Sequence, residues 1–135
     1  MVRRKILVVD YREESGLLLL RTMKRKFPES LVQMSADTTT ALRLLAAEKF
    51  DAVVLHRTEN DDAATLVKLL RGVDPEPPIV VISGIDRSRE VVAVGATEFV
   101  PFDRWLLIGT VVANAINDAR TFSLSLRTPE QALEV

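Results

Sequence analysis

The strand that decides the fold reads Lys5-Ile6-Leu7-Val8-Val9-Asp10. Its apolar, mostly β-branched run ends at a carboxylate, which is typical of a strand buried on both faces of a parallel sheet. Four similar runs follow, and segments with the period of an amphipathic helix separate them. The expected strands are Lys5–Val9, Leu31–Ser35, Ala52–Leu55, Ile79–Ile82 and Thr97–Val100, and the expected helices cover residues 14–26, 38–49, 61–72, 87–94 and 104–120.

Five βα units joined by short connections predict an α/β fold, a doubly wound five-stranded parallel sheet with helices on both faces. Ligands of such sheets bind beyond the carboxyl ends of the strands, near the switch in strand order. The side chains to consider for a site are therefore those at this edge: Asp10, Tyr11, His56, Arg57, Ser83, Gly84 and the residues after Val100.

The composition restricts the function classes. The 135 residues fit one domain, and the absence of cysteine excludes disulfides, thiol nucleophiles and thiolate metal sites. The formal net charge of −1 gives no field for nucleic acid or an anionic membrane. No apolar run approaches the roughly 20 residues that cross a bilayer, and none forms a signal-peptide core. We therefore expect a soluble, cytoplasmic protein without nucleic-acid or membrane partners.

Four motifs in order resemble the receiver domain of bacterial response regulators, over roughly residues 3 to 120. Lys5–Asp10 is similar to the family's first strand, and Phe50–His56 to its third. Pro78–Gly84 looks like the fourth strand with its terminal serine, and Gly95–Val100 resembles the Gly-Ala start of the fifth. The resemblance implies a CheY-like receiver, that is, the flavodoxin-like (βα)5 topology and a role in two-component or phosphorelay signalling.

The same resemblance implies a phosphorylation pocket, and here the pocket is incomplete. Asp10 matches the first acidic position, but Tyr11 occupies the second, and His56 stands where the phosphoacceptor aspartate is expected. The lysine that follows the fifth strand is missing, and Phe102 takes its place in an ungapped alignment. Ser83 and Phe99 match the family's switch residues. A single carboxylate holds Mg²⁺ weakly, so we expect a degenerate pseudo-receiver with no metal, no cofactor and no catalytic residue, and hence no enzyme.

His56, the chain's one histidine, has three interpretations. Its imidazole would accept a phosphoryl group, or would sense pH near its ordinary pKa of about 6.5. The favoured interpretation is that it hydrogen-bonds to Asp10 or Ser83 and fills the vacated pocket.

An uncharged run from Trp105 to Asn117 marks the last expected helix. A helix that covers one face of a sheet needs a narrower apolar stripe than this. The surplus apolar side chains predict a partner surface, formed by Trp105, Leu106, Leu107 and Val111. In receivers, the fourth helix, fifth strand and fifth helix form this surface, so the partner would be another protein or a second copy of this chain, unless the chain's own tail covers it.

The expected domain ends at residue 121, and residues 122–135 form a tail. Phe122–Leu126 alternates like a strand, and Thr128 begins a capping pattern for a short helix. The whole sequence therefore predicts a non-phosphorylatable receiver-like module that acts through protein–protein contact. The alternative is a small-molecule or anion-binding domain that uses the vacated pocket, with His56, Asp10 and Arg57 as its ligand contacts; a degenerate receiver without a present role stays open as well.

Overall fold

The computed structural model describes residues 3–58 and 61–125, and the predicted sheet is present in it. Its strands are β1 (Lys5–Val9), β2 (Leu31–Ser35), β3 (Ala52–Leu55), β4 (Ile79–Ser83) and β5 (Glu98–Pro101). All neighbouring strands pair in parallel, in the order β2-β1-β3-β4-β5. This is the flavodoxin-like strand order, and its switch point lies between β1 and β3.

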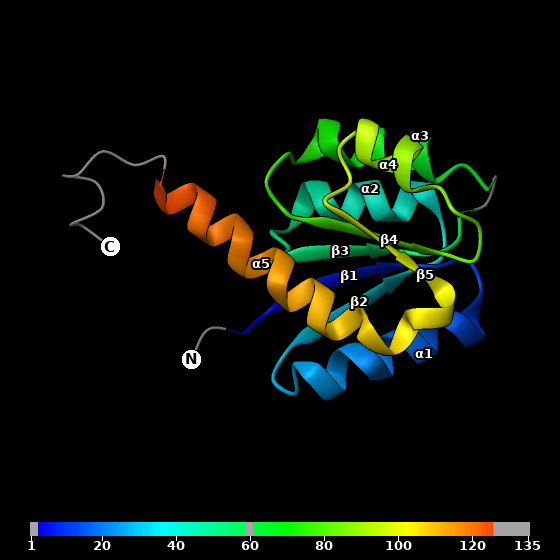
Figure 1. The fold of residues 1–135 in the computed structure, drawn as a ribbon, viewed down its shortest axis with the longest axis horizontal. Helices are drawn as coiled ribbons and strands as arrows, with labels where there is room; N and C mark the ends of the chain where they lie inside the picture. The colour runs from blue at the N-terminus through cyan, green and yellow to red at the C-terminus, as the bar shows by residue number, and fades with distance from the viewer. Residues whose placement is uncertain (1–2, 59–60, 126–135) are drawn as a thin grey trace.

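Two layers of helices cover the sheet (Figure 1). On one face lie α1 (Glu13–Lys26) and α5 (Ile108–Ser125), and on the other lie α2 (Thr38–Ala47), α3 (Ala63–Val73) and α4 (Ser88–Ala93). The α/β fold class predicted from the sequence is confirmed.

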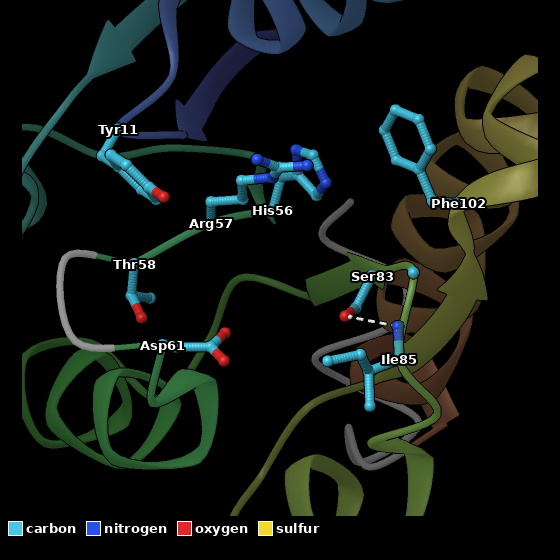
Figure 2. A pocket seen from close by; sticks show the side chains of 9 residues that line it. Tyr11, His56, Arg57, Thr58, Asp61, Ser83, Ile85 and Phe102 are labelled. Carbon is cyan, nitrogen blue, oxygen red and sulfur yellow. Dashed lines mark hydrogen bonds between the residues drawn. The ribbon is translucent and has the colours of Figure 1, made fainter.

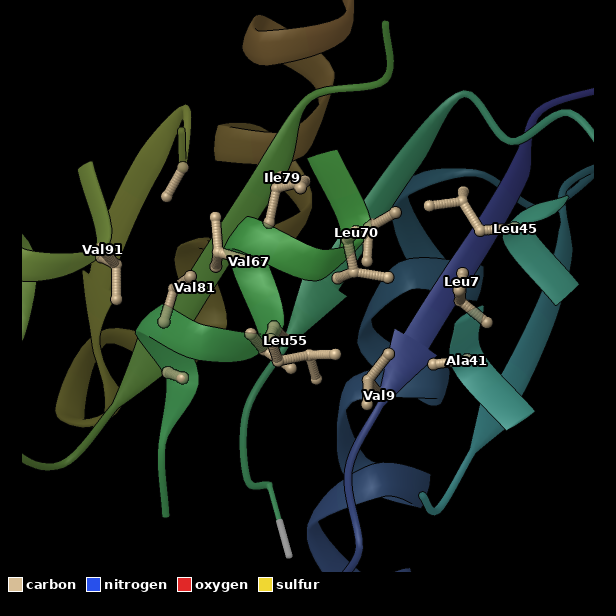
Figure 3. Packing of buried hydrophobic residues seen from close by; sticks show 14 of the residues in the cluster. Leu7, Val9, Ala41, Leu45, Leu55, Val67, Leu70, Ile79, Val81 and Val91 are labelled. Atoms are coloured by element: carbon tan, nitrogen blue, oxygen red, sulfur yellow. The ribbon is translucent and has the colours of Figure 1, made fainter. Parts of the chain in front are cut away.

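Alternation along the strands explains the two apolar cores. Leu7 and Val9 face α2 and α3, while Ile6 and Val8 face α1 and α5, because successive side chains of a strand point to opposite faces. Figure 3 shows the first of these cores, which packs Leu7, Val9, Leu55, Ile79 and Val81 against Ala41, Leu45, Val67, Leu70 and Val91. Because both faces are buried, the strands read as continuous apolar runs rather than as alternating ones.

Side-chain caps fix the starts of two helices on this face. Asp37 accepts a hydrogen bond from the backbone N–H of Thr40 at 2.6 Å, and Asp62 accepts one from that of Thr65 at 3.0 Å. Each carboxylate satisfies one of the amide groups that the first turn of a helix leaves unpaired. Asp37 is therefore the N-cap of α2, and Asp62 is that of α3.

The last expected helix is divided in two, which the sequence did not predict. A 3-10 helix, η1, runs from Phe102 to Leu107, with non-helical backbone angles at Arg104, and α5 begins only at Ile108. Short 3-10 segments often serve as connectors of this kind. The division turns Phe102 and Trp105 onto the core beside α1 and α5, and it leaves Leu106 and Leu107 outside.

The extended segment predicted at Phe122–Leu126 is wrong as far as Ser125, because α5 continues through that residue. Lengthening an existing helix avoids the cost of a new nucleus, and the far end of α5 extends beyond the sheet, where no strand is available for pairing (Figure 1). The predicted tail beyond Ser125, with its capping pattern at Thr128, lies outside the described residues, and the domain boundary at residue 121 stays a prediction.

Arg71, near the end of α3, fixes the chain that leads into β4 and β5. Its guanidinium donates to the carbonyl oxygens of Gly95 (2.8 Å), Pro75 (3.1 Å) and Pro77 (2.5 Å), and to the hydroxyl of Thr97 (3.3 Å). Gly95 has a φ of +118°, and a Cβ there would lie 2.9 Å from the Cγ of Arg71. Only glycine adopts this positive φ without strain and leaves room for the side chain of Arg71.

Candidate functional site

The carboxyl edge of the sheet brings together side chains from four elements. Asp10 follows β1, His56 follows β3, Ser83 ends β4, and Phe102 follows β5. The strand order places β1 and β3 side by side, and β4 lies between β3 and β5. The prediction that these four side chains gather at one edge is therefore confirmed by the topology.

A buried pair of side chains occupies the centre of this edge. The Nδ1 atom of His56 lies 2.9 Å from the Oδ2 atom of Asp10, and the two side chains are only 3% and 0% exposed. The backbone N–H of His56 also donates to the carbonyl oxygen of Val9 at 3.0 Å, which holds the two strand ends together. The interpretation in which His56 hydrogen-bonds to Asp10 is confirmed.

Both carboxylate oxygens of Asp10 accept hydrogen bonds from groups within the chain. Besides the contact with His56, its Oδ2 atom accepts from the hydroxyl of Ser15 at 2.5 Å, and its Oδ1 atom accepts from the backbone N–H of Arg12 at 3.0 Å. Burial alone would raise the pKa of this carboxyl, but the hydrogen bonds from His56, Ser15 and Arg12 outweigh burial and lower the pKa. Asp10 is therefore a carboxylate at neutral pH, and the Nδ1 atom of His56 carries the proton in their hydrogen bond.

Phe102 closes the other side of the imidazole. Its ring stacks on that of His56 with a centroid separation of 4.7 Å and an interplanar angle of 13°. Phe102 begins η1, so the 3-10 connection that the sequence did not predict is also what brings this ring over His56. Stacked rings at this separation add to the stabilisation that burial provides.

The residues present do not fit the Mg²⁺ site that the receiver resemblance implies. Mg²⁺ requires several oxygen ligands in an octahedral array, whereas the one carboxylate at the centre is enclosed by His56, Ser15 and Arg12. Within the described part of the chain, no three histidine, aspartate or glutamate side chains are grouped closely enough to hold a metal ion.

A pocket of about 390 Å³ lies over this pair (Figure 2). The residues that line it come from the loops after β1, β3 and β4 and from η1; they are Tyr11, His56, Arg57, Thr58, Asp61, Ser83, Gly84, Ile85 and Phe102. Asp10 is not among them, because His56 covers it. A second depression, of about 740 Å³, shares Ser83, Gly84 and Phe102 with the first and extends to Phe99 and the start of α4.

The two predicted switch residues lie on different parts of this surface. Ser83 borders both depressions, and its hydroxyl oxygen accepts a hydrogen bond from the backbone N–H of Ile85 at 3.1 Å. Phe99 is half-buried against the core below α2, α3 and α4, and it borders only the second depression.

Residues that the sequence did not single out hold the rim of the pocket. Arg87, just before α4, donates to the Oδ2 atom of Asp61 at 2.8 Å and to its carbonyl oxygen at 3.2 Å. Asp61 has a positive φ of 51°, and the hydroxyl of Thr58 accepts from the backbone N–H of Asp62 at 2.8 Å. These partners are 26 and 4 residues apart, and no sequence pattern links the first pair.

The four residues of the predicted partner surface differ in exposure. Trp105 and Val111 are half-buried against the chain's own core beside α1 and α5. Leu106 and Leu107 are 66% and 50% exposed. The part of this surface that is open to another molecule is thus the outer side of η1.

No helix within residues 3–58 and 61–125 combines the length and the apolar character that a membrane span requires.

Comparisons with known proteins found matches among solved structures. No protein-family model matches the chain. A comparison with curated proteins found no match either.

Solved structures resemble the chain closely in fold. A CheY-like response regulator receiver domain from Methanospirillum hungatei JF-1 is 15% identical, with a TM-score of 0.76 over 89% of this chain and 98% of that one. A two-component response regulator from Clostridium difficile is 21% identical, with a TM-score of 0.74 over 86% and 97%. A response regulator from Burkholderia pseudomallei, solved with a phosphorylated aspartic acid, a calcium ion and citrate, is 23% identical, with a TM-score of 0.69 over 97% and 74%. This chain has the fold of the CheY-like response regulator receiver domains.

Proposed function

We propose that this chain is a receiver-like signalling module of the bacterial two-component type that does not accept a phosphoryl group and acts through protein–protein contact. The observation that carries the proposal is the closed arrangement at the end of β3, where His56 is paired with Asp10 and stacked on Phe102. By the receiver resemblance, this is the place of the nucleophilic aspartate, the metal-binding carboxylates and the lysine.

The two aspartates described at this pocket both have partners within the chain. The carboxylate of Asp10 is buried and accepts three hydrogen bonds, and that of Asp61 is paired with Arg87. An aspartyl nucleophile needs a free carboxylate oxygen aimed at phosphorus, with positive charge placed to stabilise the phosphoryl group. The Burkholderia protein carries a phosphorylated aspartic acid; this chain has histidine at the end of β3.

The contact surface that we propose is the face of α4, β5 and η1. Val92 on α4 is 50% exposed, and Leu106 and Leu107 on η1 are exposed as well. Leu106 and Leu107 are neighbours in η1, and exposed apolar patches often mark an interaction site. The partner would be a protein or a second copy of this chain, and a net charge of −1 gives no support to a nucleic-acid partner.

Acetyl phosphate with Mg²⁺ should leave the mass of the intact protein unchanged, because β3 is followed by His56 instead of an acceptor aspartate and the described residues group no three metal-ligating side chains. Intact-protein mass spectrometry checks this result. A phosphoryl adduct that maps to any side chain of the pocket contradicts the proposal.

A triple variant, His56→Asp with Tyr11→Asp and Phe102→Lys, is the matched control for this experiment. It returns an acceptor carboxylate, a second acidic ligand and an ammonium group to the positions that the receiver resemblance assigns them. A phosphoryl adduct on the triple variant but not on the natural protein would trace the difference to these three positions.

Leu107→Glu should weaken self-association about tenfold or more, because a charge would have to be buried in the apolar contact. Light scattering over a range of protein concentrations measures the association. Leu69→Glu is the matched control, because Leu69 is an exposed leucine on α3 that lies beside the start of α2. The mass of a single chain at every concentration would contradict a homodimer through η1.

A further inference from the structure

The pocket over His56 contains more hydrogen-bond donors than acceptors. The hydroxyl oxygen of Ser83 accepts from the backbone N–H of Ile85, and that of Thr58 accepts from the backbone N–H of Asp62. Each hydroxyl therefore has its own proton left to donate to a ligand. Arg57 and Tyr11 also line the pocket and add a guanidinium and a phenol. Figure 2 shows Arg57 and His56 on one side of the pocket, and Ser83 across from them.

Two guanidinium groups lie on the Tyr11 side of the pocket. Arg12 and Arg57 both lie at the hydroxyl of Tyr11, and their hydrogen bonds and charges lower the pKa of this phenol. The guanidinium of Arg12 also lies over the Tyr11 ring, 5.6 Å from its centroid. An acidic mouth would attract a divalent cation, whereas this one favours an anion.

Among the described residues, the two carboxylates in or beneath this pocket both have partners within the chain. Asp10 lies beneath His56 with a fully buried side chain, and it does not line the pocket. Asp61 is the one carboxylate among the described lining residues, and Arg87 pairs with it at 2.8 Å. Among the described lining residues, an anion would therefore meet Arg57 and the hydroxyl protons, and the one carboxylate there is paired with Arg87.

The size and the walls of the pocket indicate an anion carried on an organic group. A volume of about 390 Å³ lies within the range of roughly 300–1,000 Å³ that is usual for small-molecule sites. Phe102 and Ile85 supply apolar wall on the side of β4 and η1. Three terminal oxygens on a phosphate monoester can accept from several donors at once, and guanidinium binds such groups through paired hydrogen bonds.

We propose that this pocket binds a small phosphate monoester without covalent reaction and without a metal ion, with Arg57, Ser83 and Thr58 as donors to the phosphate and Phe102 against its organic group. This inference goes beyond the proposed function and does not depend on the protein contact. The residues proposed to contact the ligand differ from those expected from the sequence. Arg57 is kept, His56 and Asp10 are left out, and Ser83, Thr58 and Phe102 are added.

Phenyl phosphate is the probe, used with the full-length protein in the presence of EDTA. Thermal unfolding and titration calorimetry should show saturable stabilisation by phenyl phosphate, with weaker effects of inorganic phosphate and of benzoate. Arg57→Gln should weaken binding about ten- to hundredfold, the usual effect of removing a charged hydrogen-bond partner. Arg21→Gln removes an equally exposed arginine from α1 and should leave binding unchanged.

Amide shifts in two-dimensional NMR spectra locate the ligand. Phenyl phosphate should move the amide signals of Thr58, Gly84 and Ile85 in the natural protein. The proposal is overturned if no probe binds, if the shifts scatter over exposed basic residues, or if Arg57→Gln binds as well as the natural protein. Equal binding of inorganic phosphate and phenyl phosphate would overturn the assignment of a monoester.

Two outcomes separate this inference from the proposed function. If phenyl phosphate does not bind and acetyl phosphate gives no adduct, the proposed ligand site is wrong. The proposed function as a protein-contact module is then unaffected. Binding that requires Mg²⁺ would overturn the metal-free site, and it would count against the enclosed pair of His56 and Asp10 on which the proposed function rests.

Discussion

Asp10→Ala should lower the free energy of unfolding by about 3 kcal/mol, a large part of the stability of a domain of this size. Alanine removes the acceptor of three donors, namely the His56 ring, the Ser15 hydroxyl and the Arg12 amide. The loss of the His56 hydrogen bond should contribute most, because the imidazole stays buried and its Nδ1 atom is left without Asp10 as a partner. Urea unfolding followed by the fluorescence of Trp105, the single tryptophan, measures the change.

The same substitution should change the pH dependence of stability. The folded state lowers the pKa of Asp10 below its ordinary value of 3.8, so ionisation of this group stabilises the fold above about pH 4. That contribution is lost as the pH falls through the folded-state pKa. Between about pH 5 and pH 2, the natural protein should therefore lose more stability than Asp10→Ala does.

A double-mutant cycle separates the pair from its surroundings. His56→Phe removes the stranded imidazole and keeps an aromatic ring against Phe102, so Asp10→Ala should cost about 1–3 kcal/mol less in that background. Asp118→Ala, at an exposed aspartate on α5, should change stability by no more than about 0.5 kcal/mol. Additive effects in the cycle would show that Asp10 stabilises the fold without the imidazole.

Gly95→Ala should also destabilise the protein by about 3 kcal/mol. A φ of +118° is strained for any residue with a side chain, at a cost of about 1–3 kcal/mol. The new Cβ would in addition lie 2.9 Å from the Cγ of Arg71, and the guanidinium would have to leave the carbonyl oxygen of Gly95. Urea unfolding should show a lower midpoint with an unchanged slope.

Gly72→Ala is the matched control for this effect. Gly72 lies in α3, its φ is not positive, and a Cβ there would meet nothing within 4 Å. Alanine is the better helix former by about 1 kcal/mol, so this variant should be as stable as the natural protein or more so. Equal destabilisation by both substitutions would contradict the role given to the backbone of Gly95.

The sequence predicted the sheet because burial on both faces leaves a strong signal. Continuous apolar runs such as Lys5–Val9 and Ile79–Ile82 occur only where helices cover both sides, and the helical segments between them leave few other topologies. The structure extends β4 to Ser83 and moves β5 to Glu98–Pro101, which are shifts of one residue at the ends of elements.

The last part of the chain was harder to predict for a physical reason. The apolar run from Trp105 to Ile108 has no glycine, proline or charge at the point where η1 gives way to α5. The residues Phe122–Ser125 alternate as in a strand, but α5 continues through them because extending an existing helix is less costly than starting a new element.

The residue types in the sequence predicted only part of the candidate site. The replacements at Tyr11, His56 and Phe102 are visible in the sequence, and so is the carboxylate of Asp10. The stack of Phe102 on His56 and the pairing of Arg87 with Asp61 depend on side-chain directions that no local pattern encodes.

The contacts of Arg71 have a consequence for α4. At the C-terminal end of this helix, Gly95 is held by a guanidinium that also binds Pro75, Pro77 and Thr97. At its N-terminal end, the chain is tied mainly through Arg87 to the exposed side chain of Asp61. The C-terminal end of α4 is therefore held by a half-buried guanidinium, whereas its N-terminal end, beside the depression that Phe99 borders, is held by an exposed ion pair.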